Sequence, residues 1–204
     1  VPPGPVGREG RVSIVMSRAQ ITEVAPAQPA PPSPSVPSPV PPVPEVLPES
    51  FTGSGQGWVA LVGGGPGSND LITARGLELL GQADVVVVDA LAPRDLLEDL
   101  EPSTEVIDAS KRRGRHVMSQ EEIDALLVDL ARRGKGVVRL KGGDPYVLGR
   151  GGEEAAACRA ADVAVEVVPG ITSAIAVPAA AGIPGTHRGL SRGLSGITAH
   201  AGLG

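Results

Sequence analysis

From residue 58 onward, short apolar runs alternate with segments in which apolar residues recur every three or four positions. A short β-branched run predicts a strand covered on both faces, and the longer period predicts an amphipathic helix. The runs predict strands at residues 58–62, 85–88, 105–108, 137–141 and 163–168. The other segments predict helices at about 70–82, 94–100, from Ser119 to about Leu130, 152–161 and 172–181, and residues 194–198 predict the start of one more strand.

Strands that alternate with helices are typical of α/β proteins with a largely parallel sheet. We therefore expect an α/β fold: a mostly parallel five-stranded sheet with helices on both faces. The carboxyl ends of parallel strands lie at one edge of such a sheet, and small molecules bind there in open α/β proteins. The residues that follow the predicted strands are therefore the first candidates for a functional site.

The N-terminal quarter has a different composition. Residues 1–50 hold 14 of the 21 prolines. Proline fixes φ and removes a hydrogen-bond donor, so such a stretch favours extended, solvated structure. We interpret residues 21–56 as a disordered Pro-rich linker, residues 1–20 as a tail or the remnant of an upstream module, and the chain from residue 57 as an α/β domain.

Charge and composition exclude several classes of function. A net charge of −5 argues against a general binder of polyanions, and with about 1% aromatic residues there is little to stack on nucleic-acid bases. Cys158 is the single cysteine, which excludes an intramolecular disulfide and fits a reducing, cytoplasmic compartment. No apolar run reaches the length of a membrane-spanning helix, so we expect none.

Glycines and a carboxylate follow the predicted strands. The first glycine loop, residues 63–68, does not fit the G-x-G-x-x-G dinucleotide motif, because its last position falls on Ser68. A second cluster, Gly142-Gly143-Asp144, follows the fourth predicted strand and can bring backbone close to a ligand. Asp89 ends a run of four valines, where it would serve as a catalytic base or as a helix-cap or turn aspartate.

Residues 111–116 form a basic segment, with five basic side chains in six positions. Such a run is usually a solvated loop, but this one follows the third predicted strand, at the edge where the glycine loops lie. Arginine and lysine there would bind an anion-rich ligand through charge-assisted hydrogen bonds.

Six sequence motifs occur in order between about Trp58 and His200. They are Val62–Gly67 with Asp70–Thr73, Ala83–Asp89, Lys111–His116 with Gln120–Ile123, Val137–Pro145 with Gly149–Glu154, Val168–Ser173, and Gly182–Pro184 with Thr186–Arg188. With these motifs the segment resembles the uroporphyrinogen-III C-methyltransferases, within the tetrapyrrole methylase superfamily. The resemblance implies S-adenosyl-L-methionine as methyl donor and uroporphyrinogen III as acceptor. Transfers to ring carbons 2 and 7 would give precorrin-2, on the route to sirohaem and cobalamin.

The resemblance also implies roles for particular residues. Asp89 matches the family's proton acceptor and Lys111 its proposed proton donor, and no metal is implied. Arg112, Arg113 and Arg115 would hold the carboxylates of the acceptor. Donor-binding positions carry over to Pro66, Gly142, Gly143, Asp144, Val147, Thr172 and Ser173.

The family has a second α/β domain, and the donor lies in the cleft between the two. By resemblance, residues 57–193 are the N-terminal domain, and residues 194–204 begin a truncated second one. We then expect the 204-residue chain alone to bind the donor weakly or not at all, and the full-length protein to be a homodimer. Some family members are multifunctional sirohaem synthases, which carry a dehydrogenase and chelatase module upstream of the methylase. In that case residues 1–20 would be the end of that module.

Three alternatives remain open at this point. The first is a non-catalytic remnant, which folds but catalyses no reaction. The second is a sister methylase with another acceptor such as RNA, and the third is a dinucleotide-binding oxidoreductase. The segment 142–154 argues against the second alternative, because sister methylases vary there. The failed glycine spacing argues against the third.

Overall fold

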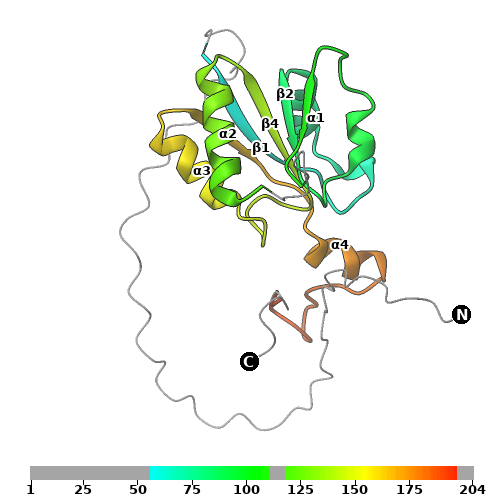
Figure 1. The fold of residues 1–204 in the computed structure, drawn as a ribbon. Coiled ribbons are helices and arrows are strands. Elements are labelled where there is room, and N and C mark those ends of the chain that lie inside the picture. Colours follow the sequence, from blue (N-terminus) through cyan, green and yellow to red (C-terminus); the bar gives the residue numbers. More distant parts are fainter. Residues whose placement is uncertain (1–55, 111–117, 197–204) are drawn as a thin grey trace, which may run out of the picture. The chain divides into compact units, whose positions relative to one another are not determined.

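In a computed structural model the described residues are 56–110 and 118–196, and they form an α/β domain around a parallel sheet (Figure 1). The strands are β1 (Trp58–Gly63), β2 (Val85–Val88), β3 (Glu105–Asp108), β4 (Gly136–Lys141) and β5 (Ala164–Val168). Their order in the sheet is β3-β2-β4-β1-β5, and every pairing is parallel. The expected fold class and all five expected strands are confirmed.

Helices cover both faces of the sheet, as expected. The helices are α1 (Ala74–Gly81), α2 (Gln120–Arg132), α3 (Gly151–Ala160) and α4 (Ser173–Ala180), with short 3-10 turns η1 (Asn69–Leu71) and η2 (Arg94–Leu97). On one face α2 and α3 pack on Val59 and Leu61 of β1, and on the other Leu79 and Leu80 of α1 pack with Ala60 and Val62 (Figure 1). Alternate residues of a strand face opposite sides, so β1 contributes to both cores.

Two expected helices are shorter than the sequence indicated. The helix expected at 70–82 is divided, because Thr73 adopts an extended conformation and caps α1 by accepting a hydrogen bond from the Gly76 amide. The helix expected at 94–100 is only the turn η2, which brings Leu96 into the core. The strand start expected at 194–198 is absent over residues 194–196, and its remainder lies outside the described residues.

A capping box starts α2. The Ser119 hydroxyl accepts a hydrogen bond from the Glu122 amide at 3.2 Å, and the Glu122 carboxylate accepts one from the Ser119 amide at 2.9 Å. We expect Ser119→Ala to lower the free energy of unfolding by about 1 kcal/mol, because one amide of the first turn loses its acceptor. Urea unfolding would measure this, and an unchanged midpoint would contradict it.

Several expectations fall outside the described residues. Residues 1–20 and all of the proposed linker except Gln56 lie there, as do residues 111–117 and 197–204. The domain boundaries therefore stay predictions. Within residues 56–110 and 118–196, no helix has both the length and the apolar character needed to cross a membrane.

Candidate functional site

Three loops at the carboxyl edge of the sheet are joined by hydrogen bonds of their backbones and of the Asp144 side chain. The loop after β1 and the loop after β4 form an antiparallel bridge, in which Gly65 and Gly143 exchange N–H···O hydrogen bonds of 3.2 and 2.8 Å. The Gly64 amide donates to the Lys141 carbonyl at 2.7 Å. The loop after β5 joins them where the Gly170 amide donates to Asp144 Oδ2 at 3.0 Å. These contacts confirm that strand ends far apart in the sequence lie together.

Glycine is required where these loops meet. A Cβ on Gly170 would lie 2.1 Å from the Gly143 carbonyl oxygen, and one on Gly63 would lie 2.6 Å from the same atom. Gly143 itself has a φ of 64°, a left-handed conformation that side chains disfavour. The loops therefore approach each other backbone to backbone. Contact between their main chain and a ligand stays a prediction.

The predicted donor-binding residues lie on these loops. Pro66 follows the Gly65 bridge, and Gly143 is so close to α4 that a Cβ on it would lie 3.6 Å from the Thr172 Cα and 4.0 Å from the Ser173 amide. Thr172 also caps α4, where its hydroxyl accepts a hydrogen bond from the Ala174 amide at 3.4 Å.

Gly142 and Val147 complete the set of predicted donor positions. A Cβ on Gly142 would lie 2.5 Å from the Leu91 carbonyl oxygen, so the loop after β2 also packs here. Val147 is half-exposed, and its amide donates to the Asp144 carbonyl at 3.3 Å. It thus lies in the same turn as Asp144, without a described contact to the other donor positions.

Asp144 organises the backbone of these loops. Its Oδ1 accepts a hydrogen bond from the Tyr146 amide at 2.8 Å, and its Oδ2 accepts the one from Gly170. Both carboxylate oxygens are therefore engaged by main-chain donors on two different loops. The side chain fixes how the loop after β4 sits against the loop after β5.

Asp89 lies at the end of β2, beside these loops. Its amide donates to the Leu140 carbonyl at 3.0 Å, which holds its backbone against β4. Its carboxylate is 37% exposed, and Oδ1 lies 3.3 Å from Nη2 of Arg139. A carboxylate that is anchored on one side and open to solvent on the other can exchange a proton with a bound molecule.

A buried ionic cluster, for which the sequence predicted no role, adjoins Asp89. It consists of Arg139 and Lys141 of β4 and Glu154 of α3, each at most 2% exposed. Glu154 Oε1 accepts from Arg139 Nε and from Lys141 Nζ, both at 3.0 Å. Burial and the nearby Arg139 guanidinium lower the pKa of the Lys141 ammonium. The feature of the sequence that could have predicted this cluster is the pair of cationic residues at alternate positions of an otherwise apolar strand.

The predicted proton donor and acceptor-binding arginines lie outside the described residues. These are Lys111, Arg112, Arg113 and Arg115. The first described segment ends at Ser110, two residues past β3. β3 neighbours β2 in the sheet. Their roles therefore stay predictions.

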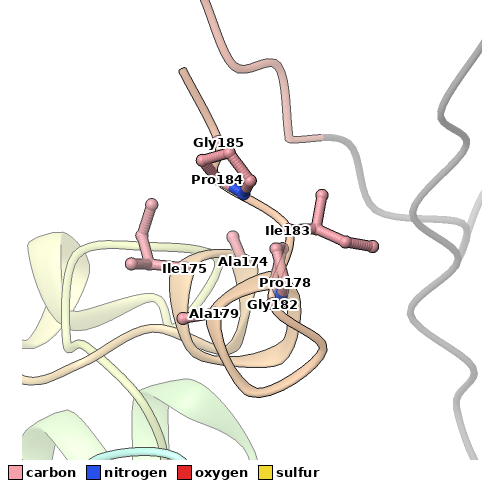
Figure 2. Close-up of a pocket in the computed structure, with 8 residues that line it drawn as sticks. All are labelled: Ala174, Ile175, Pro178, Ala179, Gly182, Ile183, Pro184 and Gly185. Atoms are coloured by element: carbon pink, nitrogen blue, oxygen red, sulfur yellow. The ribbon is translucent and has the colours of Figure 1, made fainter. Parts of the chain in front are cut away.

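A cavity of about 310 Å³ lies on α4 (Figure 2). Small and apolar residues line it, and none is charged: Ala174, Ile175, Pro178, Ala179, Gly182, Ile183, Pro184 and Gly185. It offers no group for acid–base chemistry.

Two further kinds of site find no support in the described part of the chain. It contains no group of three or more His, Cys, Asp or Glu side chains placed to hold a metal ion. Burial raises the pKa of the Cys158 thiol to about 12, so this cysteine is a poor nucleophile.

Sequence comparisons identify the family. The profile of the tetrapyrrole (corrin/porphyrin) methylases matches residues 59–202. The uroporphyrinogen-III C-methyltransferase of Methanocaldococcus jannaschii is 51% identical over 144 residues, which are 71% of this chain and 60% of that protein. An S-adenosyl-L-methionine-dependent uroporphyrinogen III methyltransferase of Methanosarcina barkeri is 52% identical over 71% of this chain and 56% of its own length. A siroheme synthase of Photorhabdus laumondii is 50% identical over 71% of this chain and 31% of its own length.

Solved structures agree with the sequence comparison. A uroporphyrin-III-C-methyltransferase from Thermus thermophilus superimposes with a TM-score of 0.59 and 44% identity, over 68% of this chain and 58% of that one. A structure of the Thermus thermophilus enzyme complexed with S-adenyl homocysteine gives a TM-score of 0.56 and 45% identity, over 67% and 56% of the two chains. The chain thus spans 31–60% of the length of these relatives. With the profile match, these similarities show that the chain belongs to the tetrapyrrole (corrin/porphyrin) methylases.

Proposed function

We propose that the full-length protein transfers methyl groups from S-adenosyl-L-methionine to carbons 2 and 7 of uroporphyrinogen III, giving precorrin-2. The observation that carries this proposal is the junction of glycine loops at the carboxyl edge of the sheet, with the Asp89 carboxylate beside it. Support also comes from relatives at 51–52% identity that are named for this acceptor.

The loop junction fits the chemistry of the proposed donor. S-adenosyl-L-methionine is a sulfonium without phosphates, so its site needs close backbone contact rather than an anion cradle. Gly142 and Gly143 carry no side chains at the junction, and the backbone of Thr172 and Ser173 lies beside Gly143. We assign donor binding to Pro66, Gly142, Gly143, Asp144, Val147, Thr172 and Ser173. The donor, when bound, supplies the methyl group.

Asp89 and Lys111 would carry the proton transfers. When a pyrrole carbon of the acceptor gains a methyl group, the ring system must lose a proton, and we assign Asp89 to accept it. The family resemblance implies a proton-donor role for Lys111, and the net reaction still releases one proton for each methyl group transferred. Holding reactants in line at such a site can supply on the order of 7 kcal/mol or more of the barrier reduction.

The basic segment would recognise the acceptor, which carries eight carboxylates. We expect replacement of Arg112, Arg113 and Arg115 by glutamine to raise the acceptor KM at least about tenfold and to change donor binding little, because charge-assisted hydrogen bonds are lost. Steady-state kinetics with each substrate varied would measure this. A larger effect on the donor KM would place the segment on the donor side.

The remaining assignments concern the whole protein. We propose that residues 57–193 are an N-terminal domain, that residues 194–204 begin the second, and that the full-length protein is a homodimer in the cytoplasm. A second domain is supported by the greater length of the relatives, because the match covers only 56–60% of each of them.

Calorimetric titration with S-adenosyl-L-methionine tests the division of the donor site. The 204-residue chain would be compared with a longer form of the protein. The longer form would include the region that the relatives have and this chain does not span. We expect heat of binding from the extended form alone. Tight binding by the 204-residue chain would contradict a donor site shared between two halves, and binding by neither form would favour the non-catalytic remnant.

A further inference from the structure

We propose that Arg139 is a positioning residue, which holds the Asp89 carboxylate where it accepts the proton of the reaction. The inference rests on the proposed function of Asp89. It starts from the guanidinium group, whose three nitrogens each contact a different group. Nε donates to Glu154 Oε1 at 3.0 Å, Nη1 donates to the Val87 carbonyl at 3.4 Å, and Nη2 lies 3.3 Å from Asp89 Oδ1.

These contacts fix the guanidinium in the plane and direction that reach Asp89. Val87 lies on β2 two residues before Asp89, and it pairs with Arg139 in the register of β2 and β4. Glu154 anchors the guanidinium from α3, on the same face of the sheet. A planar group held on two sides in this way presents its third nitrogen in one direction.

The charges of the cluster balance only when Asp89 is included. Arg139 and Lys141 carry two positive charges, and Glu154 carries one negative charge that both cations share. Buried charges are stable when they are paired, and the second carboxylate within reach of Arg139 is Asp89. Asp89 is therefore the solvent-facing end of a buried ionic network.

Stability alone does not explain these charges. β4 is the central strand of the sheet, and each of its residues is buried. Buried ion pairs lose so much solvation that apolar residues of similar volume often serve stability equally well. Among the described residues, no group forms a hydrogen bond with the buried Glu154 Oε2, which is a further cost of the arrangement. Departures of this kind from the apolar pattern are expected at functional sites, and here the network ends at Asp89.

Orientation of Asp89 matters because its side chain is partly open to solvent. Without Nη2 of Arg139, the carboxylate would be free to turn toward water. A displacement of about 1 Å at a reacting group can cost on the order of 100-fold in rate. Arg139 would act through Asp89 in this way without touching either substrate.

The test is Arg139→Lys in the full-length protein. The lysine keeps the positive charge but cannot reach three partners in a fixed plane. We expect kcat to fall on the order of 100-fold, with both KM values little changed. The matched control is Arg75→Lys, because Arg75 binds both oxygens of Glu166 at 2.9 and 2.8 Å and joins α1 to β5 on the opposite face. The control should keep normal kcat.

A double variant separates positioning from a structural role. In an Asp89→Ala background, adding Arg139→Lys should cause no further loss of the residual kcat, because the group on which Arg139 acts is gone. A further loss as large as in the unsubstituted protein would overturn the inference. Normal kcat for Arg139→Lys alone, with an active unsubstituted protein, would overturn it too and leave the proposed function intact. An inactive unsubstituted protein would overturn both.

A second variant covers the case in which Arg139→Lys does not fold. Glu154→Gln has nearly the same shape and keeps an acceptor oxygen for Arg139, but it removes the charge that anchors the guanidinium. We expect a smaller loss of kcat with both KM values unchanged. A folded Glu154→Gln protein with unchanged kcat would overturn the inference.

Discussion

Replacing Asp89 by alanine in the full-length protein should lower kcat on the order of 100- to 10,000-fold, the range for loss of a general base. The reason is that Asp89 ends β2 beside the loop junction and presents a partly exposed carboxylate that can take up the proton. The protein should still fold, with some loss of stability, because Arg139 keeps its hydrogen bonds to Glu154 and to the Val87 carbonyl and water can enter where Asp89 is 37% exposed. Single-turnover methylation and a thermal melt measure the two effects.

The matched control for this experiment is Asp84→Asn. Asp84 directly precedes β2, at the opposite edge of the sheet, and its Oδ2 accepts a hydrogen bond from the Gly136 amide at 2.7 Å. The control should lose stability rather than kcat. Near-normal turnover by a folded Asp89→Ala protein would remove Asp89 from the mechanism.

Replacing Gly170 by alanine should destabilise the loop junction and abolish donor binding. The new Cβ would lie 2.1 Å from the Gly143 carbonyl oxygen, so the loops after β4 and β5 must separate. Overpacking of this kind typically costs about 1–3 kcal/mol, and the separated loops would no longer form the proposed donor site. Urea unfolding measures the loss of stability, and calorimetry with S-adenosyl-L-methionine on the full-length protein measures the loss of binding.

The control for Gly170 is Gly81→Ala. Gly81 ends α1, and a Cβ there would meet nothing within 4 Å. This variant should keep full binding and equal or greater stability, because alanine favours helix. Unchanged donor binding by Gly170→Ala would contradict the assignment of the donor to this junction.

The parts of the fold that rest on local pattern were predictable from the sequence. The run of four valines at 85–88 forms β2, and Ser119 with its acidic followers starts α2, as expected. Helix lengths were less predictable at 70–82 and 94–100, because a cap at Thr73 and the burial of Leu96 decided them.

The buried ionic network was not predictable from local pattern. It depends on the register that pairs Val87 with Arg139 and on the packing of α3, which carries Glu154 over the sheet. Neither relation is visible in the spacing of residues along the chain. The meeting of Gly63, Gly143 and Gly170 was foreseen only as a common sheet edge, and their backbone contacts come from the tertiary fold.

Mass spectrometry of the product is the most direct test of the proposed activity. The full-length protein would be incubated with S-adenosyl-L-methionine and, in separate reactions, uroporphyrinogen III, a later corrinoid intermediate and ribosomal RNA. We predict that uroporphyrinogen III alone gains methyl groups, two per molecule, at carbons 2 and 7. Methylation of another acceptor, or of none, would contradict the proposed function.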